Sequence, residues 1–323
     1  MSALIENVNG VDQFIGRTDA WHRLGDVVGD DFDFELVKLS RPEIASPVGK
    51  RALFTMDAVG RIGEQVSNKC AVVRKYDNKI VGVVGTEYGC VNPEEAYEWA
   101  NTISQFGDIP IVSAGNLRDG SQFFFTLRMG TESPAGIDYT PYITVVSSHD
   151  GSQAMQAIFS PTVVVCANTL AMAQGDAVHK ISLRHTSRIQ DRMAIALDTL
   201  RLGAYQVDET NNLIHLLANT PISFHEAMAH ILPEIEAEGA AKTRRSNMIT
   251  EMFHLRDQYT PEEYLSTGWG LIQAVNSWEN WAKPIRGTTN TDDARAVRQF
   301  DAAVKGTGQD ITKRAVQFVL ANA

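Results

Sequence analysis

The sequence predicts an α+β protein with a strand-rich N-terminal part, built from antiparallel hairpins, and a mainly helical C-terminal part. Short β-branched and aromatic runs separated by turn residues occupy the first half. Apolar residues recur at helical spacing after position 186. The composition, 44% hydrophobic and 21% charged, is that of a globular chain. We therefore predict a strand-rich domain at 1–185 and a helical region at 186–323, which can pack on the first domain.

Two hairpins are predicted in the first half. Residues 70–76 and 79–85 are β-rich runs that flank an Asp-Asn pair, which favours a tight turn. Residues 109–115 and 122–127 flank a segment that ends in Asp-Gly, another turn signal. Both segments are therefore expected to fold as antiparallel pairs.

A helix and two buried strands complete the predicted first domain. Asn92 can cap a helix that has Pro93 at its first position and acidic residues in its first turn. Residues 142–146 and 161–166 are nearly continuous apolar runs, which suit strands covered on both faces.

The C-terminal part is expected to form several helices. Thr186 or Ser187 can cap the first of them, because an apolar stripe that includes Ile189 and Met193 follows at helical spacing. Further helices are predicted at 224–235, 240–254, 271–281, 292–304 and 311–320.

Charge and cysteine content limit the function. The 39 acidic and 29 basic side chains give a formal charge of −10, which argues against a protein that coats duplex DNA with its whole surface but allows a local basic groove. Three cysteines without a C-x-x-C motif predict neither a disulfide framework nor a zinc finger. No glycine-rich phosphate loop is present, and we predict no cofactor. Without a signal peptide or an 18-residue apolar run, the expected location is the bacterial cytoplasm.

Four ordered motifs resemble one family. They are Trp21-His22-Arg23-Leu24-Gly25, Ser148-His149-Asp150-Gly151, Val165-Cys166-Ala167-Asn168-Thr169-Leu170 and Arg184-His185-Thr186. Together they are similar to the phage/plasmid-like proteins of domain-of-unknown-function family 932, over roughly residues 15–280. The resemblance implies a home on mobile genetic elements, often beside replication and recombination genes. It implies no activity.

Four residues are candidates for catalysis: His149, Asp150, Cys166 and His185. His149 can act as a base oriented by Asp150, or both can belong to a turn and bond their own backbone. Cys166 can be a thiol nucleophile activated by a histidine, or a small buried side chain in a valine run. The four could also bind zinc or iron, but no pair has the spacing of a metal motif, and we predict no metal site.

A basic stretch is the candidate nucleic-acid site. Lys180 and Arg184 alternate with apolar residues, so a strand would present them on one face. Arg188 and Arg192 are four apart and share one face of a following helix. These four cations can follow a phosphate backbone, or they can form an ordinary solvated surface.

The first functional hypothesis is therefore a DNA-metabolism protein of a phage or plasmid that binds single-stranded DNA and promotes annealing, as a homo-oligomer and without membrane contact. One alternative is a hydrolase built on His149, Asp150, Cys166 and His185. Another is an acidic interaction protein that binds a host factor through its negative charge.

Overall fold

The computed structural model describes residues 14–16, 34, 45–117, 120–163, 180–186, 188–189, 191, 202–231, 262–277 and 310–323. The chain divides into two compact units. The first comprises Met1–Met129, Ile143–Ile158 and Lys180–Leu202, and the second comprises Gly130–Tyr142, Phe159–His179 and Gly203–Ala323. Antiparallel strands dominate the earlier part and helices the later part, which confirms the predicted α+β class. Within the described residues, no helix is both long and apolar enough to cross a membrane.

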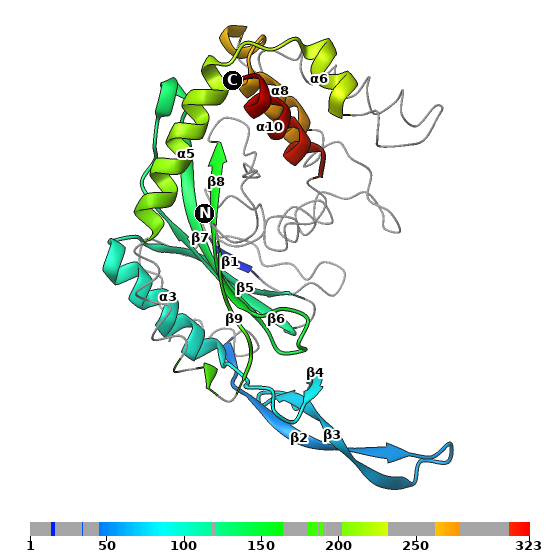
Figure 1. Cartoon of the computed structure of the whole chain (residues 1–323). Helices are drawn as coiled ribbons and strands as arrows, with labels where there is room; N and C mark the ends of the chain where they lie inside the picture. Colours follow the sequence, from blue (N-terminus) through cyan, green and yellow to red (C-terminus); the bar gives the residue numbers. More distant parts are fainter. Residues whose placement is uncertain are drawn as a thin grey trace. The chain divides into compact units, whose positions relative to one another are not determined.

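The larger sheet has six strands in the order β1-β5-β6-β7-β8-β9 (Figure 1). The strands are β1 (Phe14–Gly16), β5 (Ile111–Leu117), β6 (Gln122–Arg128), β7 (Tyr139–Ser148), β8 (Met155–Val163) and β9 (Lys180–Leu183). β5 and β6 form the predicted antiparallel hairpin, with Gly120 at a positive φ of 84° in its turn. β9 pairs antiparallel with β8, so the basic stretch begins in an edge strand.

Helix α3 (Pro93–Gly107) packs against the larger sheet and begins as predicted. The backbone N–H of Asn92 donates to Glu95 Oε2 at 2.7 Å, one half of a capping box. The apolar side of α3 and alternate residues of the strands form one core, because alternate strand residues point to the same face. Its members include Ala96, Trp99, Ala100, Phe123, Phe125, Leu127, Ile143, Val145, Met155 and Ala157.

A second, three-stranded sheet has the order β2-β3-β4. Its strands are β2 (Val48–Met56), β3 (Ile62–Arg74) and β4 (Ile80–Gly85). β3 and β4 are joined at Asp77-Asn78, which confirms the first predicted hairpin. Its core is small and consists of Val48, Cys70, Val72, Val81 and Val84.

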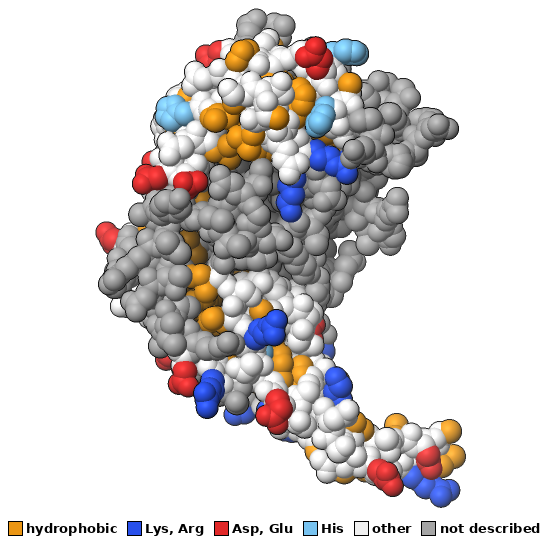
Figure 2. All heavy atoms as spheres, viewed as in Figure 1, with side chains coloured by type: hydrophobic (Ala, Val, Ile, Leu, Met, Phe, Trp, Pro, Cys, Tyr) orange, Lys and Arg blue, Asp and Glu red, His pale blue; other side chains and the backbone are white. Residues whose placement is uncertain are grey.

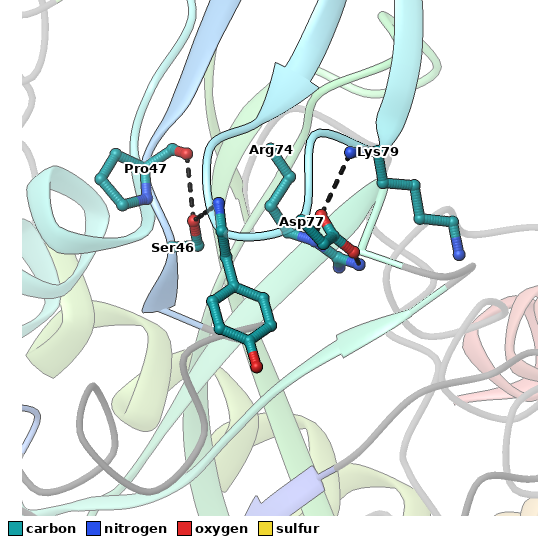
Figure 3. A network of polar contacts seen from close by, with 6 residues as sticks. Ser46, Pro47, Arg74, Asp77 and Lys79 are labelled. Carbon is teal, nitrogen blue, oxygen red and sulfur yellow. Dashed lines mark hydrogen bonds and ion pairs between the residues drawn. The ribbon is translucent and has the colours of Figure 1, made fainter.

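The turn between β3 and β4 contains a partly buried ion pair (Figure 3). Arg74 donates to both carboxylate oxygens of Asp77, at 3.0 and 2.6 Å, and the backbone N–H of Lys79 also donates to this carboxylate, at 3.1 Å. The bond from Arg74 is the main cause that lowers the pKa of Asp77 to about 2. Since Arg74 is only 7% exposed, the carboxylate neutralises a charge that water reaches poorly.

Replacing Asp77 by Asn is expected to lower the unfolding free energy by about 1–2 kcal/mol, because a buried guanidinium loses its counter-charge. The contribution of Asp77 should be complete above pH 4 and fall as the pH drops toward 2, since its folded-state pKa is lowered. Urea unfolding at pH 7 measures the loss. Asp57→Asn is the matched control, because Asp57 and Arg61 form an exposed pair at 3.8 Å, and it should change stability by less than about 0.5 kcal/mol.

The second unit contains the described helices of the C-terminal part. They are α5 (Leu202–Asn219), α6 (Phe224–Ile231), α8 (Gly268–Ser277), α10 (Asp310–Asn322) and the short η2 (Glu262–Tyr264). The predicted helices near 224–235, 271–281 and 311–320 are confirmed by α6, α8 and α10, whereas those at 240–254 and 292–304 lie outside the described residues. These helices pack with Ile137 and Tyr139 around Trp269, which is 2% exposed.

Candidate functional site

His149 lies directly after β7 and is almost completely buried. Its side chain is 2% exposed and its ring contacts that of Phe123, with centroids 5.0 Å apart. Burial is the main cause that lowers its pKa to about 3, and the nearby His185 adds to this. Among the described residues, its Nδ1 has no hydrogen-bond partner. At neutral pH the ring is therefore uncharged.

Asp150 belongs to the turn that follows His149. Its Oδ1 accepts a 2.8 Å hydrogen bond from the backbone N–H of Ser152, and Gly151 has a positive φ of 75°. This is the local side chain-to-backbone bond of an Asx turn, one of the two interpretations of this motif. The carboxylate is thus directed to its own backbone, and no hydrogen bond joins it to His149 in the described part of the chain.

His185 is the centre of a hydrogen-bonded network. Its Nδ1 donates to the carbonyl oxygen of Gly89 at 2.9 Å, since a carbonyl can only accept. Burial lowers the pKa of His185, so the ring is neutral and its Nε2 accepts from Ser147 Oγ at 3.1 Å. Tyr88 stacks on the ring with centroids 4.6 Å apart and donates its hydroxyl to the Ser148 carbonyl at 2.6 Å. The sequence motifs contained His185 and Ser148, but nothing in the sequence indicated that Ser147, Tyr88 and Gly89 take part in the same hydrogen-bonded network.

The hydrogen bonds are those of a serine nucleophile and its general-base histidine: the serine hydroxyl donates to one ring nitrogen, and a carbonyl accepts from the other and so fixes the tautomer. However, Ser147 is 0% exposed, and a nucleophile must be reached by its substrate. Cys166, the fourth catalytic candidate, lies outside the described residues. No group of three His, Cys, Asp or Glu side chains that could hold a metal ion occurs in the described segments.

Two glycines allow backbone segments to approach each other closely beside this network. A Cβ on Gly82 of β4 would collide with the backbone of His149 and Asp150, and one on Gly89 would collide with the Thr186 carbonyl. The first contact holds the three-stranded sheet against the turn after β7, and the second holds the segment after β4 against the segment after β9. Only glycine fits at either position without movement.

Gly82→Ala is accordingly expected to destabilise the first unit by about 1–3 kcal/mol, because the added methyl group meets backbone rather than a movable side chain. Gly85→Ala, three residues later, is the matched control: a Cβ there has no neighbour within 4 Å, so its effect should stay within about 0.5 kcal/mol. Thermal or urea unfolding of the two variants tests the close approach. Equal stabilities would contradict it.

The sequence-predicted basic residues are only partly described. Arg184 and Arg188 are exposed, Lys180 lies in β9, and Arg192 is outside the described residues, as is the side chain of Lys180. Ser182 is exposed like Arg184, whereas Ile181 and Leu183 pack against the core beneath α3. The alternation expected for this strand is therefore present.

A larger group of basic side chains was not singled out from the sequence. We call residues 48–85 the arm, residues 54–65 its tip, and residues 48–53 and 66–85 its base. The base carries six basic residues and one acidic residue, a formal charge of +5. The tip has a formal charge of −1, and the rest of the chain has −14. The basic residues of the base are Lys50, Arg51, Lys69, Arg74, Lys75 and Lys79.

Most of these cations face solvent. Arg51, Lys69, Lys75 and Lys79 are exposed, whereas Arg74 is buried. Lys50 is exposed too, but its Nζ donates to the carbonyls of residues 86 and 88 at 2.7 and 2.9 Å. The arm is therefore the basic part of an acidic chain.

The tip is apolar and exposed on both of its strands. Figure 2 shows hydrophobic side chains gathered at the end of the arm, at the lower right. They are Phe54, Met56, Val59 and Ile62, which are 53–77% exposed.

The comparisons with known proteins identify the family. A family model described as a domain of unknown function, DUF932, matches residues 80–304, which is more than half of the chain. The chain belongs to this family. No curated protein and no solved structure matches it.

Membership in DUF932 confirms the resemblance that the sequence motifs indicated. The matched region begins at Ile80, the first residue of β4, and contains His149, His185, Arg184 and Arg188. β2 and β3, which form most of the arm, precede it. The buried network thus lies within the DUF932 region, and the tip lies before it.

Proposed function

We propose that this chain is a DNA-metabolism protein of a phage or plasmid that binds single-stranded DNA in the bacterial cytoplasm and promotes annealing in recombination or replication. The base of the arm is the contact surface. One observation carries the proposal: a chain of formal charge −10 concentrates +5 in the base of the arm. Nucleic-acid binding is driven by Lys and Arg contacts to phosphate, so a local basic surface on an acidic protein is where a polyanion would bind.

An exposed aromatic side chain favours a single strand over a duplex. Tyr76 is 60% exposed and lies between Lys75 and Lys79 in sequence, on the turn at the base. Unpaired bases stack on such aromatics, whereas bases in a duplex already stack on each other. Four other aromatic residues are 0–4% exposed and belong to the core, so they cannot stack on bases: Phe123, Phe124, Tyr139 and Tyr142.

Arg184 and Arg188 belong to a segment that lies close to the base within the first unit. The backbone N–H of Gly89 donates to the His185 carbonyl at 3.3 Å, so the segment that follows β9 lies beside the segment that follows β4. Lys50 is bonded to that second segment through the carbonyls of Thr86 and Tyr88. The segment that contains Arg184 and Arg188 is therefore adjacent to the base of the arm.

Binding of a fluorescent oligothymidylate, measured by anisotropy at 50 and 200 mM salt, tests the proposal. Lys69→Glu/Lys75→Glu should weaken binding about tenfold or more at the lower salt and make the salt dependence shallower, because two phosphate contacts become repulsive. The matched control pair is Lys75→Glu and Lys313→Glu, each alone, because both change the net charge equally and Lys313 lies outside the base and the tip. Equal affinities of the two variants, or no binding by the wild type at micromolar protein, would overturn the assignment.

The hydrolase hypothesis keeps one supporting observation, the 3.1 Å bond between Ser147 Oγ and His185 Nε2. An activated serine reacts with a fluorophosphonate probe. Because Ser147 is fully buried, we expect no labelling of the folded protein. Labelling that is lost in Ser147→Ala would instead support the hydrolase and place catalysis at this pair.

A further inference from the structure

Among the described residues, no strand pairs with the outer edge of β2. β2 ends the three-stranded sheet, so one side of its backbone has no neighbouring strand in that sheet. Natural edge strands carry charges, prolines or covering segments that prevent such pairing. Lys50 and Arg51 lie at the start of β2, but residues 52–56, Ala-Leu-Phe-Thr-Met, contain no charge and no proline.

The distal part of the arm also has little to stabilise it by itself. Residues 54–56 and 62–65 are exposed, and this part of the ribbon has only two strands. An isolated two-stranded ribbon is marginally stable in water. A patch formed by Phe54, Met56, Val59 and Ile62 would gain stability from being covered.

The exposed edge of β2 is complementary in charge to a second copy of itself. An antiparallel pair of β2 strands with its two-fold axis at Phe54 sets Asp57 of one copy opposite Arg51 of the other, because the two residues lie three positions on either side of the axis. Both side chains are exposed, and opposite charges on facing residues stabilise a strand pair. The tip has a formal charge of −1, so two tips repel each other far less than two whole chains of −10 would.

We propose that the β2 edges of two copies of this chain pair antiparallel at the tips of their arms, forming a two-fold dimer with a continuous β-ribbon. Antiparallel pairing of two identical strands is symmetric, so it closes after two copies. The inference rests on the edge of β2 and does not require that the base binds nucleic acid. If both proposals hold, the dimer carries two copies of the positively charged arm base, which can contact one or two molecules of single-stranded DNA.

The molar mass in solution, measured by light scattering after gel filtration, tests the dimer. The wild type should have twice the 35.5 kDa of one chain. Phe54→Lys/Met56→Lys should reduce the mass to one chain, since charged side chains protect an edge strand and both positions are exposed. Ile80→Lys/Val83→Lys places the same charges on equally exposed residues of β4 and should leave the dimer intact.

Cysteines introduced one at a time test directly which residues lie near the two-fold axis. Among Leu53→Cys, Phe54→Cys and Thr55→Cys, at least one should form a disulfide-linked dimer under mild oxidation, because a residue near the two-fold axis faces its own copy. Val83→Cys and the wild type should not. A wild type that stays monomeric, or a dimer lost in the β4 variant and kept in the β2 variant, would overturn the proposal. So would a β2 variant that keeps its mass and loses affinity for oligothymidylate, because the tip would then contact nucleic acid.

Discussion

Lowering the pH from 7 to 4 is expected to reduce the unfolding free energy of the first unit by about 3 kcal/mol through His149 alone. The unfolded chain takes up a proton at this histidine near its ordinary pKa of 6.5, whereas burial holds the folded-state pKa at about 3. Stability is therefore complete above pH 7 and falls as the pH drops from 6.5 toward 3. His185 adds to the loss in the same direction, because burial lowers its pKa as well.

Urea unfolding at pH 7, 6, 5 and 4 measures this loss. His149→Phe removes the titrating group and keeps an aromatic ring against Phe123, so its unfolding free energy should depend less on pH over this range. The titratable and charged groups that act on His149, namely His185, Asp150 and Arg74, are unchanged in the variant. If the wild type and His149→Phe show the same pH dependence, His149 is not buried in its neutral form.

The parts of the fold that the sequence predicted depend on local signals. Asp77-Asn78 makes a tight turn in almost any context, and Asn92 followed by Pro93 begins a helix wherever the chain permits one. The hairpin of β3 and β4 and the start of α3 are therefore where they were expected. The same holds for the buried run at 142–146 in β7, whose β-branched and aromatic residues suit a strand in a sheet. The strand predicted at 161–166 overlaps only the last three residues of β8, and residues 164–166 lie outside the described part of the chain.

β2 and the first half of β3 were missed because they lack the usual pattern, although the hairpin at the other end of β3 was predicted. β2 and the first half of β3 are exposed on both faces, so no alternation of apolar and polar residues marks them. The basic residues of the base are spread over some 30 positions and come together only when three strands pair. Along the sequence, basic residues lie close together at 180–192, and this shorter stretch was therefore predicted as the binding site.

The buried network could not be predicted for a different reason. His185 bonds to Gly89 and Ser147, which are 96 and 38 residues away in sequence. Such partners depend on the order of the strands, and the sequence did not determine that order. His185 and Asp150 both act electrostatically on His149, so the three residues lie near one another. The hydrogen-bond partners of His185 are a serine and a backbone carbonyl, and Cys166 lies outside the described residues.

His185→Ala is expected to have the other large effect, a loss of about 3–4 kcal/mol of unfolding free energy. The substitution removes the bonds to Gly89 and Ser147 and the stacking on Tyr88, and it leaves a cavity between them. These contacts join the end of β9 to β7 and to the segment after β4, so the loss should appear as faster amide hydrogen exchange in all three. Tyr88 is expected to lose order because its ring has lost its partner.

A double-mutant cycle separates the hydrogen bond from the packing. Ser147→Ala alone should cost about 1 kcal/mol, because it leaves a buried Nε2 without its donor. In the His185→Ala background the same change should cost much less, giving a coupling of about 1 kcal/mol. A coupling near zero would mean that the bond does not contribute to stability. Ser147 is fully buried and makes no proposed phosphate contact, so oligothymidylate affinity should be unchanged in folded Ser147→Ala.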